Sequence, residues 1–243
     1  LGECMKAQNL PSTYIPIWLL FKLPVLILLG LLCFPFIEKK LFTTKKNRFV
    51  IGSTLISIFI IIFSLIFLKV NLYDELRQIL FLIPLIFLIS LIGIYFYSNR
   101  LATKFLFIFI IFFIFQNFKI YPYNYVWLNN LTHITKVNNV FELDYWGVSS
   151  KKVANYLEKN KLLNNCTISN RNIAIKAFIK NNDKCFLSFR DLHSKNKRPF
   201  NVVLMERATK KGVPNNCKNI HNEEINLNFS NENLILARIF KCS

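Results

Sequence analysis

Long runs of apolar residues fill the first half of the chain and are scarce in the second half. These runs lack the regularly spaced polar positions with which a helix of a soluble protein faces water. Each run has, or comes close to, the length of about 18 residues that lets a helix cross a bilayer. The pattern predicts an α-helical membrane region over residues 14–118, preceded by an external loop at residues 1–13. About four transmembrane helices are expected, near residues 15–37, 49–68, 79–96 and 101–118.

Residues 119–243 alternate short apolar runs with clusters of Asn, Asp, Lys and Pro, and this pattern predicts a small α/β domain. Residues 149–160 are expected to form a helix, because Ser149 or Ser150 can cap it and its apolar residues recur at three-four spacing. Short strands are expected at residues 173–179, 185–189, 201–205 and 234–240.

The basic residues between the apolar runs predict the orientation of the chain in the membrane. Residues 38–48 carry five Lys and Arg side chains, and short basic loops stay on the cytoplasmic side. Arg100 lies between the third and fourth runs, Lys104 lies near the start of the fourth, and this basic loop falls on the same side. The loop at residues 71–78 and all of residues 119–243 are therefore expected outside.

The cysteine residues agree with an external C-terminal domain. Cys166, Cys185, Cys217 and Cys242 all lie beyond residue 118, in a compartment that permits disulfides. At least one disulfide is expected, and three pairings remain open. A metal site is not expected, because no C-x-x-C spacing occurs and the three histidines are scattered.

The chain is strongly basic, with a formal net charge of +18, and residues 119–243 hold 20 Lys and Arg against 9 Asp and Glu. A basic surface can bind nucleic acid, but a domain attached to a membrane rarely meets it, so no nucleic-acid partner is expected. Membrane lipids with anionic headgroups are the expected partners. Alternatively, much of the charge is solvated surface in a chain rich in Lys and Asn.

Three segments, in their order and in their spacing relative to the apolar runs, resemble one family. They are LPSTYIP at 10–16 followed by FKLP at 21–24, LYDELRQILFLIP at 72–84, and YPYNYVWLN at 121–129 followed by FELDYWG at 141–147. Together they are similar to the C-terminal half of polytopic membrane glycosyltransferases of the GT-C type. The most similar group is bacterial and resembles protein O-mannosyltransferases and the aminoarabinose transferase (glycosyltransferase family 39). The resemblance covers residues 10–150, and Gln78 departs from it where the family has a His.

The resemblance implies an activity and a location. A sugar leaves a polyprenyl-phosphate donor and is attacked by an acceptor hydroxyl or amine on the outer side of a bacterial inner membrane. The family's catalytic acidic residue lies in an external loop near its N-terminus, which has no counterpart here, and this chain begins at Leu1. We therefore expect the C-terminal part of a longer enzyme, with no catalytic residue of its own and an unknown acceptor.

Three residues are candidates for holding the donor phosphate. Arg77 is expected at the external membrane surface, and a guanidinium can grip two phosphate oxygens. Asp74, three residues earlier, could orient it, and Lys22 lies within the first apolar run, where a cation is costly in lipid. Alternatively, Arg77 and Asp74 form an interfacial salt bridge that caps a helix, and Lys22 extends toward the outer surface.

Aromatic and acidic residues beyond the fourth run are candidates for binding the sugar or the prenyl chain. The acidic pair flanks Leu143 and would share a face of an extended segment, where it could hold sugar hydroxyls or a divalent cation. No other cofactor is expected. Alternatively, the aromatic residues form an interfacial belt, and the acidic residues have a structural role. The candidates are Tyr121, Tyr123, Tyr145 and Trp146, with Tyr125 and Trp127 nearby, and the acidic pair Glu142 and Asp144.

A rival hypothesis retains the membrane region but assigns no enzymatic activity to the chain. In it, the chain is a polytopic membrane protein whose external domain binds a ligand or a partner. A transporter fits less well, because only Pro24 and Pro84 interrupt the apolar runs, whereas transporters carry paired broken helices.

Overall fold

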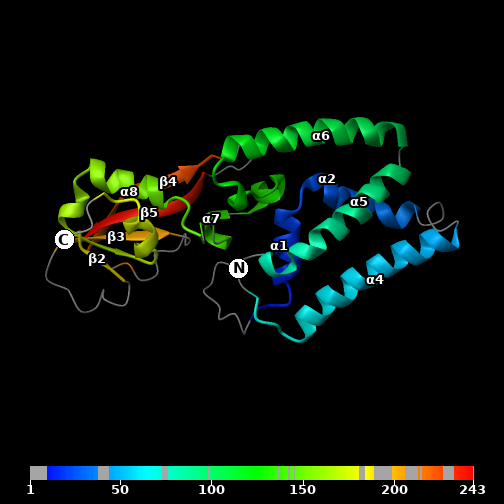
Figure 1. The fold of residues 1–243 in the computed structure, drawn as a ribbon, viewed down its shortest axis with the longest axis horizontal. Helices are drawn as coiled ribbons and strands as arrows, with labels where there is room; N and C mark the ends of the chain where they lie inside the picture. The colour runs from blue at the N-terminus through cyan, green and yellow to red at the C-terminus, as the bar shows by residue number, and fades with distance from the viewer. Residues whose placement is uncertain are drawn as a thin grey trace. The chain divides into compact units, whose positions relative to one another are not determined.

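The computed structural model of the protein describes two compact units, which are treated separately below (Figure 1). The helical unit comprises described residues up to Lys119 together with Trp127–Thr132, and the α/β unit comprises Ile120–Val126 and most of the chain after residue 132. The described residues are 10–37, 44–72, 76–97, 99–135, 137–141, 143–144, 146–180, 184–188, 199–205, 213, 215–226 and 233–242.

The helical unit contains two helices that are long and apolar enough to cross a membrane, Lys45–Phe67 and Arg77–Tyr97. A third span results if a bent pair, Tyr14–Lys22 with Val25–Ile37, is counted as one. In the fourth predicted region only a shorter apolar section, Leu106–Ile120, is found among the described residues. The elements are α1 (Tyr14–Lys22), α2 (Val25–Cys33), η2 (Phe34–Ile37), α4 (Lys45–Phe67), η3 (Arg77–Leu82), α5 (Ile83–Tyr97) and α6 (Asn99–Ile120).

The longest helix, α4, begins at a polar cap and continues with apolar residues on every side. The Thr44 hydroxyl accepts a hydrogen bond from the Asn47 amide at 3.2 Å, which satisfies one of the free N–H groups of the first turn. Phe59, Phe63 and Phe67 stack in series and are each more than half exposed. Exposed aromatic side chains along a whole helix are expected where lipid, not water, is the solvent.

The first predicted span, residues 15–37, is not one continuous helix but a bent pair of helices. The chain bends by 113° between α1 and α2. Pro24 has no N–H to donate and forces Leu23 into an extended conformation with ψ of 138°. The bend leaves helix carbonyls without partners, which would be costly in an apolar surrounding.

Asn129, from beyond α6, supplies the missing hydrogen-bond donors. Its side-chain amide donates to the carbonyls of Leu20 and Leu23, both at 2.6 Å, and its backbone N–H donates to Phe21 at 2.8 Å. Trp127 packs edge-on against Phe113 of α6. The segment Trp127–Thr132 therefore belongs to the helical unit, although the sequence predicted it in the external domain.

Helices α2 and α5 pack closely through small residues, and Figure 1 shows them side by side. A Cβ added to Gly30 would lie only 2.5 Å from the Ser90 carbonyl oxygen, and one added to Gly93 would collide with the Gly30 carbonyl. The Ser90 hydroxyl donates to the Ile27 carbonyl at 2.7 Å. Small residues and a hydroxyl-to-backbone hydrogen bond are the usual way in which helices associate in lipid.

The α/β unit contains a five-stranded mixed sheet in the order β2-β1-β3-β5-β4. Strand β1 runs parallel to both β2 and β3, whereas β5 is antiparallel to β3 and β4. The strands are β1 (Cys166–Ser169), β2 (Phe186–Leu187), β3 (Phe200–Met205), β4 (Cys217–Ile225) and β5 (Leu234–Cys242). The helices are η4 (Asn124–Val126), η5 (Asn130–Ile134), whose last residues alone fall in this unit, α7 (Val137–Val140), α8 (Ser150–Lys159), η6 (Leu162–Asn164) and α9 (Asn172–Lys176).

Both faces of the sheet are apolar and buried. Alternate residues of β3 point to opposite faces, so Val203 and Met205 join a core with α8 and α9, while Val202 and Leu204 join a second core on the other face. Helix α8 places Leu157 in the first core. The helix is amphipathic, and burial of its apolar face fixes it on the sheet.

The expected helix at residues 149–160 is confirmed as α8, and the expected strands at 185–189, 201–205 and 234–240 are confirmed as β2, β3 and β5. The expected strand at 173–179 is wrong, because these residues form α9 and the turn after it. Two strands, β1 and β4, were not predicted. Ser149 does not cap α8 with its side chain, which bonds to Asp144 instead.

Two disulfides join neighbouring strands at the two ends of the strand order. Cys166 pairs with Cys185 beside the β1–β2 pairing, and Cys217 pairs with Cys242 between β4 and β5. The expectation of at least one disulfide is confirmed in the structure, and one of the three open pairings is selected.

Candidate functional site

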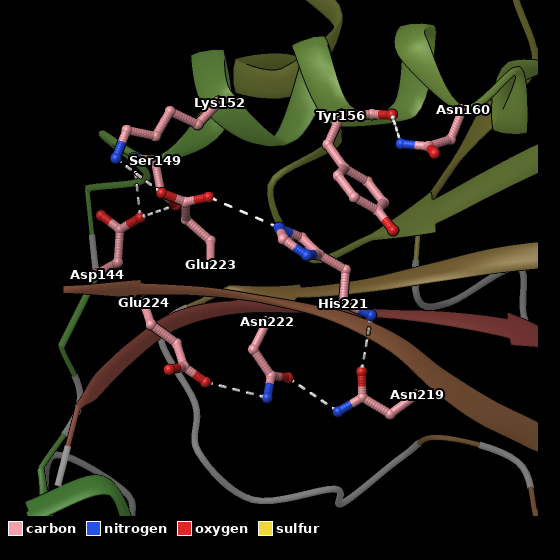
Figure 2. Close-up of polar contacts among 10 residues, drawn as sticks. All are labelled: Asp144, Ser149, Lys152, Tyr156, Asn160, Asn219, His221, Asn222, Glu223 and Glu224. Carbon is pink, nitrogen blue, oxygen red and sulfur yellow. Dashed lines mark hydrogen bonds and ion pairs between the residues drawn. The ribbon is translucent and has the colours of Figure 1, made fainter.

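The polar residues of the α/β unit gather where the loop before α8, the helix itself and β4 meet (Figure 2). The loop turns at Gly147, whose φ of +69° is a left-handed conformation that favours glycine. The Gly147 amide donates to the Asp144 carbonyl at 3.1 Å. This turn brings Asp144 beneath the first residues of α8.

Asp144 is fully buried, and its carboxylate accepts four hydrogen bonds. The amides of Val148 and Ser149 donate to it at 2.9 Å and 3.0 Å, and the hydroxyls of Tyr125 and Ser149 donate to its two oxygens. Each oxygen therefore already has two donors. This arrangement is that of a structural carboxylate that caps the start of α8, with no free oxygen for a sugar or a cation.

Next to this carboxylate, Lys152 joins α8 to β4 and to the buried Tyr123. The Lys152 Nζ lies 2.9 Å from Glu223 Oε1 and 5.0 Å from the centre of the Tyr123 ring. Burial raises the pKa of the Tyr123 phenol against the opposing effect of the lysine charge. Burial lowers the pKa of Lys152, but its hydrogen bond and charge interaction with Glu223 outweigh this, so that the pKa is raised overall. Both groups therefore keep their protons at neutral pH.

His221 extends this set of charged residues along β4. Its Nε2 lies 3.8 Å from Glu223 Oε2, and its ring stacks on Tyr156 with centroids 3.9 Å apart and planes at 8°. Figure 2 shows Lys152 and Tyr156 pointing from α8 toward His221 and Glu223. The two β4 residues are separated by one position, so they share a face of the strand.

Neighbouring residues of β4 form a second polar chain, which meets the first at the His221 backbone. The His221 amide donates to the Asn219 side-chain oxygen at 3.2 Å (Figure 2). The Asn219 amide donates to Asn222 at 2.8 Å, Asn222 donates to Glu224 at 3.2 Å, and Asn233 donates to Glu224 at 2.9 Å. Two irregularities interrupt the pairing with β5, between Asn219 and His221 and between Glu223 and Glu224. Such bulges redirect side chains at the edge of a sheet.

Chemically, the cluster of the α/β unit is a set of satisfied ion pairs and hydrogen bonds. Within the part of the chain that the structure describes, no group of three or more His, Cys, Asp and Glu side chains is placed to hold a metal ion. Glu142 and Tyr145 lie outside the described residues. The exposed aromatic candidates are Tyr121, which is 76% exposed, and Trp146, which is 54% exposed, whereas Tyr123 is buried.

The two basic candidates lie in the helical unit. Lys22 ends α1 directly before the bend, and its Nζ lies 5.6 Å from the centre of the Trp18 ring. Arg77 is exposed at the start of η3. Asp74, which was expected to orient it, lies outside the described residues. Lys22 and Arg77 therefore belong to one unit, and the described aromatic and acidic candidates belong to the other.

A small pocket, partly open to solvent, lies in the helical unit between the start of α1 and the end of α4. Most of its lining is apolar, and its polar groups are those of Ser12, Tyr14 and Lys69. Lys69 follows α4 with a φ of +47°, where the chain reverses. The remaining lining residues are Leu10, Pro11, Ile15, Leu65, Ile66, Val70 and Leu72.

Sequence reasoning did not single out Lys152, Glu223 or His221 as interacting residues. The sequence offered one weak signal on α8, which is that Lys152 and Tyr156 are four positions apart and so share a face of the helix. The signal on β4 was the alternation of His221 and Glu223, in a segment too polar to be recognised as a strand.

No family model, no curated protein and no solved structure matches this chain.

Proposed function

We propose that this chain forms the part of a membrane glycosyltransferase that binds the lipid carrier, in an enzyme that transfers a sugar from a polyprenyl-phosphate donor to an external acceptor. The observation that carries the proposal is a convergence within the helical unit. Residues of four segments that resemble the family lie at two features of this unit. One is the pocket beside α1, which residues of 10–16 and Leu72 line, and the other is the bend that ends α1, where Asn129 bonds Leu20 and Leu23.

The pocket has a composition suited to a prenyl phosphate. Its apolar wall, contributed by residues such as Ile15, Leu65 and Leu72, can accept hydrocarbon, and Lys69 offers a cation to an anionic headgroup. The pocket is formed by the start of α1 and the end of α4, and both of these helix ends are predicted to lie on the external side. A lipid phosphate would lie at this depth.

Arg77 and Lys22 are the further cations proposed for the phosphate. Arg77 lies within the family-like segment that starts at Leu72, a residue of the pocket wall. Its guanidinium can bind two phosphate oxygens in a fork, which a lysine ammonium cannot do. Lys22 lies at the bend that the third family-like segment stabilises through Asn129.

The test is selective binding of a polyprenyl phosphate over the uncharged polyprenol by the purified protein, measured by native mass spectrometry. We expect Arg77→Ala to weaken binding of the phosphate by about 10- to 100-fold, the effect of losing a charged hydrogen bond. Arg77→Lys should be nearly as damaging, because the fork is lost. Lys104→Ala, a change of another exposed cation in α6, is the matched control and should leave binding unchanged.

Equal retention of polyprenyl phosphate and polyprenol would contradict the proposal. Wild-type binding by Arg77→Lys would remove Arg77 from the site while leaving Lys69 and Lys22 as the cations to test. Enzymatic function itself is checked by transfer of labelled sugar from the lipid donor in membranes that contain the complete gene product. A ligand-binding membrane protein without enzymatic activity would show no such transfer.

A further inference from the structure

Apolar side chains that do not contribute to the core gather at one place on the α/β unit, around helix α9. The helix already buries Ile175 and Ile179 in the core against the sheet. On its outer side, Ile173 is 83% exposed and Phe178, just after the helix, is 48% exposed. Both sides of this short element are therefore apolar, although only one of them packs against the protein.

The loop before α8 adds two more exposed apolar side chains to the same place. Trp146 is 54% exposed and Val148 is 38% exposed. Between them lies Gly147, where an added Cβ would sit 3.8 Å from the Ala174 Cβ of α9. The loop and the helix are thus adjacent, so the exposed residues on either side of Gly147 lie close to Ile173, the residue before Ala174.

The charge around this surface is mainly positive. Residues 146–152 and 170–180 contain no Asp or Glu. Exposed lysines lie beside the apolar side chains on both elements, with Lys151 in the first turn of α8 and Lys176 at the end of α9. The Glu158 carboxylate of α8 accepts a hydrogen bond from the Lys180 amide at 3.1 Å, so the basic border ends there. An exposed apolar surface bordered mainly by basic residues is typical of proteins that lie on anionic bilayers.

We propose that this surface, called the α9 patch and formed by Trp146, Val148, Ile173 and Phe178 with Lys151 and Lys176, docks onto the headgroup region of an anionic bilayer. A tryptophan is well suited to this depth, because its ring is apolar and its N–H can remain hydrated. The lysines would be attracted to the negative surface potential of the lipid. The α/β unit begins where the apolar section of α6 ends, so the bilayer is present at high effective concentration.

The test uses the whole chain reconstituted in nanodiscs, with a fluorophore on a single introduced cysteine. In a background of Cys4→Ser and Cys33→Ser, which leaves the four disulfide cysteines in place, the label is attached at Ile173→Cys. The matched control is Lys159→Cys in the last turn of α8, nine residues and about 14 Å along the helix from the end that contacts the patch. Quenching by lipids with a spin label near the headgroup is then measured.

We expect quenching at position 173 to be several-fold stronger than at position 159 in nanodiscs that contain anionic lipid. It should decrease in zwitterionic lipid and at high salt, because the Debye length shrinks as ionic strength rises. Lys151→Glu combined with Lys176→Glu should lower quenching to the zwitterionic level, whereas replacement of both lysines by arginine should preserve it. Retained disulfides in each variant show that the unit is folded.

Two results would overturn the proposal. Equal quenching at positions 173 and 159, or quenching at 173 that is indifferent to anionic lipid, would show that the patch does not face the bilayer. Energy transfer between labels at position 173, rising with the number of chains per nanodisc and independent of lipid charge, would assign the patch to contacts between copies of the chain.

Discussion

Among single residues, Asp144 shows how the environment of a carboxylate decides its role. The sequence marked it as a candidate for binding a sugar or a cation, because Asp144 and Glu142 flank Leu143 and would share a face of an extended segment. In the structure, both of its oxygens are occupied by protein donors, among them the hydroxyls of Tyr125 and Ser149. A carboxylate with four donors holds the backbone in place and has no capacity left for substrate chemistry.

Replacement of Asp144 should therefore destabilise the α/β unit. Asp144→Ala leaves buried N–H and O–H groups without an acceptor, and the expected loss is on the order of 3 kcal/mol. Faster hydrogen exchange in the first turns of α8 would report it. The control is Glu224→Ala, because Glu224 accepts hydrogen bonds only from exposed amides at the sheet edge. Equal protection of α8 in wild type and Asp144→Ala would contradict this role.

The raised pKa values of Tyr123 and Lys152 predict how stability depends on pH. Both folded-state values lie above the ordinary values of 10.0 and 10.5, so the folded state retains these protons when the unfolded state begins to lose them. Their contribution is complete at neutral pH and is lost as the pH rises above about 10. Thermal unfolding midpoints measured from pH 9 to pH 11.5 should fall less steeply with rising pH in the double variant Tyr123→Phe/Lys152→Met than in wild type. An identical slope would exclude this pair as the cause.

Part of this cluster could be anticipated from the sequence, and part could not. Asp144 stood out because it pairs with Glu142 across Leu143 in a segment that resembles the family. The pairing of Lys152 with Glu223 depends on β4 lying next to α8, and nothing local in either segment specifies that contact. The polar partners in such a cluster can be identified only when the strand order and register of the sheet are known.

For secondary-structure elements, the crossing of α2 and α5 gives the sharpest test of the helical unit. Gly30→Ala places a methyl group against the backbone of Ser90, and the helices must separate. Overpacking of this kind costs about 1–3 kcal/mol. Gly52→Ala in α4 is the matched control, because nothing lies within 4 Å of the added Cβ, and it should be neutral or slightly stabilising. Thermal unfolding in detergent would separate the two variants, and similar losses would show that α2 and α5 do not cross in this way.

The elements that the sequence predicted wrongly have identifiable physical causes. Residues 173–179 carry enough Ile to suggest a strand, but Ile175 and Ile179 are four positions apart and meet the core from one side of a helical turn. Strand β4 is nine residues long, yet it lies at the edge of the sheet, where polar side chains are favoured. The bend between α1 and α2 depends on Asn129, which is distant in sequence. Strongly apolar segments were easier to predict, because lipid or a buried sheet imposes one pattern on them.

At the scale of the whole molecule, the two disulfides bear on its orientation. Disulfides persist where the surroundings are oxidising, and both lie in the α/β unit, in which no other cysteine occurs. This agrees with the orientation predicted from the basic loop at residues 38–48. That loop lies mostly outside the described residues, and the orientation stays a prediction.

Labelling of introduced cysteines on intact cells tests this orientation. An impermeant reagent should label a cysteine placed at Asn196 and leave one placed at Thr43 unlabelled, although both positions lie outside the described residues. Peptide mapping without reduction should recover Cys166 joined to Cys185 and Cys217 joined to Cys242. The reverse labelling pattern, or four free thiols, would place the α/β unit on the cytoplasmic side.

The hydrogen bonds of Asn129 also impose an order on the biosynthesis of the protein. The ribosome adds Asn129 106 residues after Leu23, whose carbonyl it satisfies. During translation, α1 and α2 therefore leave the ribosome without the donors on which their bend depends. The bend can be completed only after α6 has been made and the chain has returned to the helical unit. The bent pair of α1 and α2 is thus synthesised well before the residue that completes its hydrogen bonding.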